Sequence, residues 1–117
     1  MARLLAALCV AAALAGAARA DAPPVGPLPP GPTTTIHVRH GLLFGLALPR
    51  PRAGFAWRGA RQSDATIARP LYEGELDGNI VFVYRAGHRG TTTVVYALTR
   101  DEQQKAFQAR FFKVVVF

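Results

Sequence analysis

Cysteine is almost absent from this chain. Its 117 residues include one cysteine, Cys9, which lies in an apolar stretch near the N-terminus. A single cysteine forms no intrachain disulfide, and loss of that stretch would also remove any thiol nucleophile or thiolate metal ligand. The remaining domain must therefore depend on its own hydrophobic core for stability.

Groups that carry catalysis are equally scarce. The chain has three histidines, and its one serine, Ser63, lacks the surrounding glycines of a nucleophile motif. A glycine-rich phosphate-binding loop is missing as well. The sequence therefore predicts no catalytic residue, no cofactor and no enzyme activity.

Residues 1–20 have the pattern of a secretory signal peptide. Arg3 gives a positive start, residues 4–16 are almost wholly apolar, and Ala18 and Ala20 form a small-residue cleavage site. The apolar run is too short for a membrane anchor, and Cys9 lies too early in it for lipidation. We expect export to the periplasm or the extracellular space.

Proline separates this segment from the rest of the chain. Residues 21–32 contain six of the nine prolines. Such a stretch is extended and semi-rigid, which is typical of a linker, with a polyproline ligand for a partner domain as the alternative. Residues 33–117 remain, enough for one small domain.

Helical periodicity is missing from residues 33–117, where apolar and polar residues alternate instead. Strands are predicted over residues 33–39, 42–48, 55–58, 79–85, 91–98 and 107–117, with a short strand or turn near 66–69. Short strands separated by glycine and proline turns predict an all-β fold, an immunoglobulin-like β-sandwich of six to eight antiparallel strands.

The same alternation predicts the core. Strand 42–48 is apolar on both faces, so we expect it to be central. The pattern of the last strand changes phase between Phe111 and Phe112, which indicates a bulge or a face shared by two packing layers. The predicted core residues are Phe44, Leu46, Trp57, Phe82, Val94 and Tyr96.

Acidic residues are few: 7 against 14 basic ones, a net charge of +7, which falls to +5 without the two arginines of residues 1–20. The arginines are spread singly, with no basic run, so they are interpreted as solvated strand faces and no nucleic-acid partner is predicted. Charge alone leaves a polyanion binder, or a preference for acidic partners and anionic envelope surfaces, as weaker alternatives.

Metal ligands are also poorly arranged. His37 and His40 are three apart at a strand end and point to opposite faces. Glu73, Glu75 and Asp77 offer three carboxylates but no further pattern that would complete a calcium shell. No metal site is predicted, and the acidic stretch is interpreted as a solvated loop.

The most distinctive motif is residues 48–57, LPRPRAGFAW. Two prolines and a glycine form a rigid loop, and an aromatic strand follows. This stretch resembles the first binding loop of the chagasin family of cysteine-protease inhibitors, which typically reads Asn-Pro-Thr-Thr-Gly before an aromatic strand. Here the proline, glycine and strand are kept, while arginine and alanine replace the threonines. The matching residues are Arg50, Pro51, Arg52, Ala53, Gly54 and Phe55.

Two other loops of that family have weaker counterparts. The family loop Gly-X-Gly-Gly corresponds here to Glu75, Leu76, Asp77 and Gly78, of which the last glycine is kept. The family loop Arg-Pro-aromatic corresponds to Arg100, Asp101 and Glu102, of which the arginine is kept.

The resemblance implies a partner and a mechanism. Chagasin-type domains are β-sandwiches whose three loops block the cleft of papain-like cysteine proteases. We therefore expect an exported protein-binding domain that uses loops 49–54, 73–79 and 99–106. The alternative is a non-inhibitory envelope or adhesion-type sandwich module, and the sequence leaves the oligomeric state open.

Overall fold

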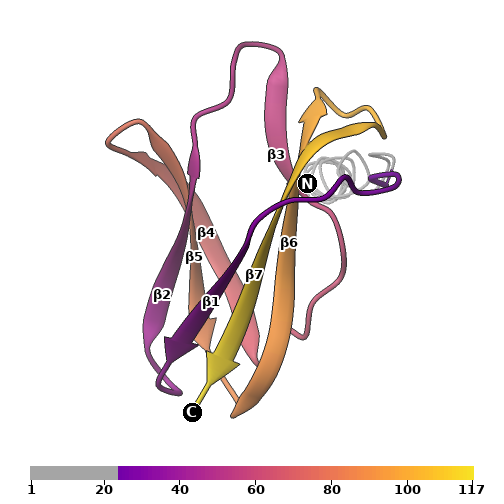
Figure 1. The fold of residues 1–117 in the computed structure, drawn as a ribbon. Coiled ribbons are helices and arrows are strands. Elements are labelled where there is room, and N and C mark those ends of the chain that lie inside the picture. The colour runs from indigo at the N-terminus through magenta and orange to yellow at the C-terminus, as the bar shows by residue number, and fades with distance from the viewer. Residues whose placement is uncertain (1–23) are drawn as a thin grey trace, which may run out of the picture.

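The computed structural model describes residues 24–117, and the predicted signal peptide and Cys9 lie outside this part of the chain. It contains seven strands (Figure 1). They are β1 (Thr33–Val38), β2 (Leu43–Pro49), β3 (Phe55–Gly59), β4 (Ala68–Leu76), β5 (Asn79–Ala86), β6 (Gly90–Arg100) and β7 (Ala106–Val116). Within residues 24–117, no helix has the length and apolarity needed to cross a membrane.

The strands form two sheets that pack face to face. One has the order β1-β7-β6-β3 and the other the order β2-β5-β4. This arrangement confirms the predicted immunoglobulin-like β-sandwich. One pairing departs from the antiparallel expectation, because β1 runs parallel to β7 and pairs with it from Thr33 to Val38.

The core lies between the two sheets. Leu46, Phe82, Val94 and Tyr96 are buried there, as predicted. The ring of Phe82 stacks on that of Tyr96 with 4.1 Å between centroids. Phe44 and Trp57 are only half-buried and pack against the margin of the core.

Two tyrosines place a polar contact inside this core. The hydroxyls of Tyr84 and Tyr96 form a short hydrogen bond to each other. Burial raises the pKa of Tyr84, and the hydrogen bond to Tyr96 offsets part of that rise. Burial, followed by the hydrogen bond to Tyr84, raises the pKa of Tyr96 strongly. Both shifts favour the neutral phenols in the folded state.

The prediction that strand 42–48 is central is wrong. β2 is an edge strand, and its outward-facing residues, such as Leu43 and Ala47, are exposed. The strand covered on both faces is β6, where Val95 and Ala97 are buried on the side away from the core. The prediction assumed that apolar residues on both faces of β2 meant burial on both faces, but no layer covers the outer face.

The proline-rich segment contacts the outer side of the β1-β7-β6-β3 sheet. The backbone of Gly26 donates to the carbonyl of Gln104 at 2.8 Å, and Arg61 donates to the carbonyls of Val25 and Gly26. Gly31 passes so close to β7 that an added Cβ would lie 1.9 Å from the carbonyl oxygen of Ala109. Only glycine fits this crossing.

One further local prediction is wrong, and another left two alternatives between which the structure decides. The acidic stretch is not a loop, because β4 continues to Leu76 and leaves a two-residue turn, Asp77-Gly78, before β5. β7 pairs with β6 without interruption through Phe111 and Phe112, and its irregularity lies opposite Leu98 and Thr99. Of the two predicted explanations for the phase change, the face shared by two packing layers is therefore supported, since Ala109 is buried on the outer face.

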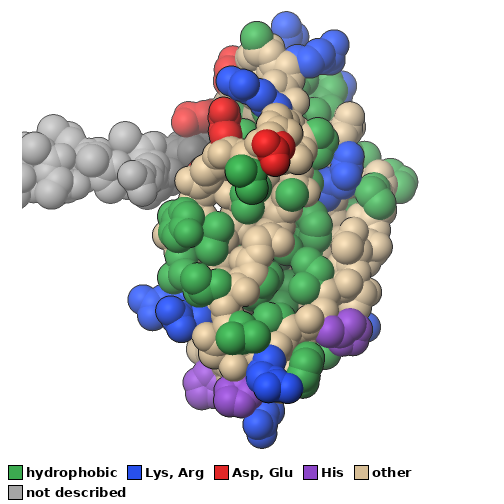
Figure 2. Space-filling model, turned by 90° about the vertical axis from the view of Figure 1, so that its left-hand side faces the viewer, with side chains coloured by type: hydrophobic (Ala, Val, Ile, Leu, Met, Phe, Trp, Pro, Cys, Tyr) green, Lys and Arg blue, Asp and Glu red, His purple; other side chains and the backbone are tan. Residues whose placement is uncertain are grey.

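Charged side chains are concentrated at the two ends of the sandwich. On the face shown in Figure 2, lysine and arginine lie at both ends, histidine lies toward the lower end, and acidic residues lie toward the upper end. Hydrophobic side chains occupy the middle. All seven strands and the core of the described residues lie between residues 33 and 117.

Candidate functional site

Three connections meet at the upper end of the sandwich in Figure 1. They are the β2–β3 loop (residues 50–54), the β4–β5 turn (residues 77–78) and the β6–β7 loop (residues 101–105). Antiparallel pairing brings them together, because Pro49 pairs beside Asn79 in one sheet and Phe55 pairs beside Arg100 in the other. The structure thus places all the predicted partner-binding residues at one end.

The β2–β3 loop is fixed at both of its ends. The indole nitrogen of Trp57 donates to the carbonyl of Pro49 at 2.8 Å, which ties the start of the loop to β3. The amide of Phe55 donates to the carbonyl of Arg52 at 3.0 Å and closes a turn. Gly54 in this turn has a φ of 84°, a conformation that glycine adopts without strain.

The β4–β5 turn is tied to this loop. The amide of Arg50 donates to the carbonyl of Gly78 at 3.1 Å. The guanidinium of Arg50 also lies 3.6 Å from the carboxylate of Glu75, and both side chains are more than half exposed. An exposed ion pair adds little stability, so the backbone hydrogen bond is the stronger link.

The turn itself has the geometry of a tight hairpin. Asp77 and Gly78 both have positive φ values, 51° and 77°. Two successive residues of this kind match the twist of the flanking strands, and Asp-Gly is a preferred sequence for them. The tip is therefore short and fixed, with Leu76 exposed beside it.

The β6–β7 loop is held by β3. The amide of Asp101 donates to the carbonyl of Gly54 at 2.9 Å, which joins this loop to the β2–β3 loop. Below it, Arg58 donates to the carbonyl of Gln103 at 2.6 Å and to the hydroxyl of Thr99 at 3.1 Å. The Thr99 hydroxyl in turn donates to the carbonyl of Asp101 at 2.8 Å. One half-buried arginine thus organises the base of the loop.

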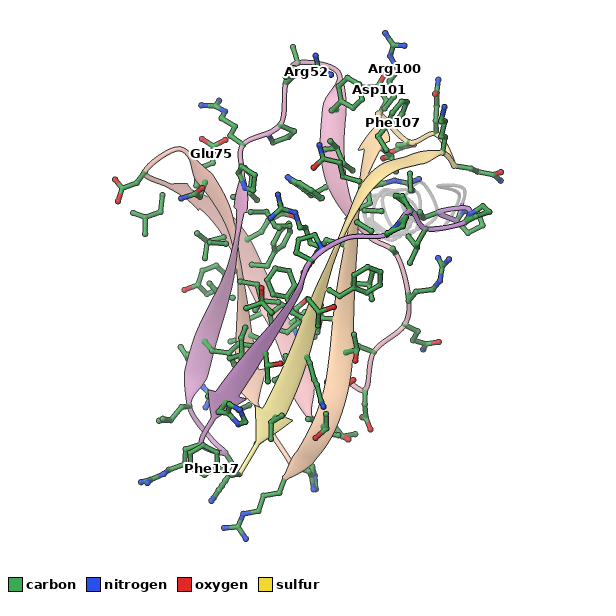
Figure 3. All side chains as sticks on the ribbon, in the orientation of Figure 1. Arg52, Glu75, Arg100, Asp101, Phe107 and Phe117 are labelled. Atoms are coloured by element: carbon green, nitrogen blue, oxygen red, sulfur yellow. The ribbon has the colours of Figure 1, made fainter. Side chains whose placement is uncertain are left out.

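Aromatic and cationic groups cover the tip. The guanidinium carbons of Arg52 and Arg100 lie 5.1 Å and 5.9 Å from the centroid of the Phe55 ring. Phe107 meets the same ring edge-on at 5.3 Å. Figure 3 shows Arg52 at the upper end, between Glu75 on one side and Arg100 and Asp101 on the other.

Phe107 also lies on this surface, although the sequence did not predict it as a site residue. Its pattern assigned it to a strand, but the irregularity opposite Thr99 turns its side chain toward Phe55, and it remains 42% exposed. In the sequence, the alternation of apolar and polar residues in β7 begins only after Phe107. That late start was the one sign that Phe107 does not belong to the regular strand pattern. The surface therefore has an aromatic centre, two basic side chains above it, and acidic residues to either side.

Nothing in this part of the chain gathers metal ligands. Within residues 24–117, no three histidine, cysteine, aspartate or glutamate side chains lie together in a way that could hold an ion. Glu75 lies two residues before the β4–β5 turn and Asp77 lies within it, and both side chains are exposed. The chemistry of this end is that of a binding surface made of charged and aromatic groups.

Comparison with solved structures finds the same fold in two cysteine protease inhibitors. One is EhICP2 from Entamoeba histolytica, with a TM-score of 0.59 and 16% identity over 71% of this chain and 85% of its own. The other is PbICP-C, solved in complex with falcipain-2, with a TM-score of 0.53 and 12% identity over 81% of this chain and 98% of its own. These matches confirm at the level of fold the predicted resemblance to chagasin-like inhibitors.

The sequence comparisons give no match. No protein-family model fits the chain, and no curated protein matches it. The two solved structures named above are of protease inhibitors, which is compatible with the predicted lack of enzyme activity.

Proposed function

We propose that this protein is an exported inhibitor of papain-like cysteine proteases that occludes the protease cleft with its three loops. The observation that carries the proposal is the hydrogen-bonded end of the sandwich. The β2–β3 loop donates to the β4–β5 turn through Arg50 and accepts from the β6–β7 loop through Gly54. This end belongs to a fold shared with two cysteine protease inhibitors, one of them solved with its protease.

Loops that are already ordered before binding lose less conformational entropy on docking. Pro49 and Pro51 restrict the backbone of the central loop, and the Trp57 hydrogen bond fixes where it starts. Binding then needs little further ordering, so more of the contact energy appears as affinity. The short turn of Asp77 and Gly78 contributes a second rigid edge.

The charges predict a partner with an acidic rim. Arg52 and Arg100 project from the tip, and their guanidinium groups suit carboxylates better than the neutral floor of a cleft. We expect inhibition to be weak in high salt, because exposed charges more than about 10 Å apart are screened at 0.1 M ionic strength.

The charged tip also favours a second candidate, a non-inhibitory binding module of the envelope. Inhibition assays with residues 24–117 against several papain-like enzymes distinguish the two candidates. The inhibitor proposal predicts competitive inhibition that weakens as salt rises, and no effect on a serine protease. Absence of inhibition at high micromolar concentrations against every papain-like enzyme tested would favour the binding module.

Export is tested separately. Cleavage after Ala20, found by N-terminal sequencing of protein from the periplasm or medium, would support it. Intact protein retained in the cytoplasm would contradict it.

A further inference from the structure

The end of the sandwich opposite the three loops has a different chemistry. It is formed by the β1–β2 connection (residues 39–42), the β5–β6 connection (residues 87–89) and Phe117. Backbone hydrogen bonds hold these segments together: Gly41 donates to Ala86, Ala86 donates to Leu42, and His40 donates to Phe117, each at 2.7–2.8 Å. The lower end is therefore a defined surface.

Arginine dominates the charge of this surface. Arg39, Arg69, Arg85 and Arg89 are exposed there, and none of them forms an ion pair within residues 24–117. Arg69 and Arg85 are direct cross-strand partners on β4 and β5. Like charges placed opposite each other destabilise a sheet, and an anion between or beside them relieves that repulsion.

The side chains of two of these arginines lie over the turn region. Arg85 donates to the carbonyl of Gly41 at 3.2 Å, and Arg89 lies 3.3 Å from the imidazole of His40. Asp64 is an acidic residue close to this surface. It lies two residues before Thr66, whose carbonyl accepts a hydrogen bond from the amide of His88. The upper end carries both signs of charge, whereas the lower end is predominantly basic.

Large apolar side chains are exposed among these arginines. Leu42, Leu43 and Phe117 are 55%, 52% and 54% exposed. Leu42 is the last residue of the β1–β2 connection, and Leu43 pairs beside Arg85. Apolar side chains that project among arginines suit the boundary of a lipid bilayer, where they enter the acyl region while the arginines meet anionic headgroups.

We propose that this lower surface, the basal patch of Arg39, Leu42, Leu43, Arg85, Arg89 and Phe117, docks peripherally on an anionic lipid bilayer. The two ends lie at opposite extremes of a molecule with a longest dimension of 52 Å. A protein docked by the basal patch presents its three loops away from the bilayer. This inference rests on the lower end alone and stands whether or not the upper end inhibits a protease.

The test is co-sedimentation of residues 24–117 with lipid vesicles. We expect binding at low salt to vesicles of phosphatidylcholine with phosphatidylglycerol, and little binding to vesicles of phosphatidylcholine alone. Each arginine near an anionic surface contributes about fivefold to partitioning, so the double change Arg85→Gln with Arg89→Gln should weaken binding roughly 25-fold. The matched control, Lys105→Gln with Lys113→Gln, removes the same charge elsewhere and should weaken it much less.

A second pair of variants separates a bilayer from a soluble polyanion. Leu42→Ser with Leu43→Thr keeps every charge and removes only exposed apolar groups, so the melting temperature should stay unchanged. We expect vesicle binding to fall about tenfold or more, while any binding to polyphosphate stays as it was. Equal binding to neutral and anionic vesicles, equal loss in the lysine control, or no effect of the leucine changes would overturn the proposal.

Discussion

Replacing Trp57 with phenylalanine separates the packing of this side chain from its role in holding the central loop. The change keeps an aromatic ring at the margin of the core but deletes the 2.8 Å hydrogen bond to Pro49. It also weakens the contact with Arg110, whose guanidinium carbon lies 5.8 Å from the indole ring. Both contacts are near the surface, so each is expected to contribute about 0.5 kcal/mol. We expect a loss of about 1 kcal/mol in the free energy of unfolding.

That loss has a measurable size. For a domain of this length, about 1 kcal/mol lowers the melting temperature by roughly 4–8 °C. Trp57→Ala also removes the packing of a half-buried ring and should cost about 2–3 kcal/mol, less than the ~3–5 kcal/mol typical of a fully buried aromatic. Urea unfolding followed by circular dichroism checks both values, because it does not depend on tryptophan fluorescence.

Hydrogen exchange locates the effect. In Trp57→Phe the amide of Arg50, which donates to Gly78, should exchange faster. The amide of Ala86, which donates to Leu42 at the other end, should keep its rate. If Trp57→Phe unfolds at the same urea concentration as the parent, or exchange at Arg50 is unchanged, the indole hydrogen bond does not hold the loop.

Three further predictions concern the tip, the core and the acidic turn. Replacing Arg52 and Ala53 by threonines restores the family loop. In titrations against papain-like enzymes, the change should lower the inhibition constant and reduce its dependence on salt. Unchanged inhibition and salt dependence would contradict the role of the arginine. The pKa of Tyr84 and Tyr96 is higher in the folded state than the value of about 10 in an unfolded chain. Their contribution to stability is therefore present below about pH 10 and lost as the pH rises above it, so their phenolate absorbance should appear together with unfolding in a 295 nm titration; ionisation of both while the far-ultraviolet spectrum stays native would contradict it. Calcium should leave the melting temperature unchanged in the parent and in Asp77→Asn, and a calcium-dependent rise abolished by that change would reveal a site.

Local patterns were sufficient for much of the fold. β5 and β6 alternate clearly, and their inward residues Phe82, Val94 and Tyr96 form the core. Proline and glycine marked the β2–β3 loop and the β4–β5 turn, because these residues restrict or relax the backbone wherever they occur. The residues of these two connections could therefore be located without knowledge of the sheet order.

Other features depend on neighbours that are distant in sequence. β4 was missed because it is an edge strand, exposed on both faces from Arg69 to Leu76, and so shows no alternation. β2 was placed at the centre because its outer face is apolar, although no layer covers that face. The parallel pairing of β1 with β7 joins the two ends of the domain and has no local signature.

The residues of the candidate site could be predicted, but the hydrogen bonds that link its loops could not. The loop residues were identified from their resemblance to known binding loops, whereas the links between the loops are tertiary. Arg58 looked like an ordinary strand residue, yet it holds the β6–β7 loop through the carbonyl of Gln103 and the hydroxyl of Thr99. Phe107 joins the tip only because the pairing of β6 and β7 is irregular there.

Inhibition by occlusion requires that the three loops together enter a protease cleft. Hydrogen–deuterium exchange of residues 24–117, alone and with a papain-like protease whose catalytic cysteine has been alkylated, tests it most directly. We expect protection in residues 50–54, 75–78 and 100–105 of the complex, and unchanged exchange in residues 39–42 and 87–89 at the opposite end. Protection confined to the lower end or to the outer face of a sheet, or no complex with any papain-like protease, would contradict it.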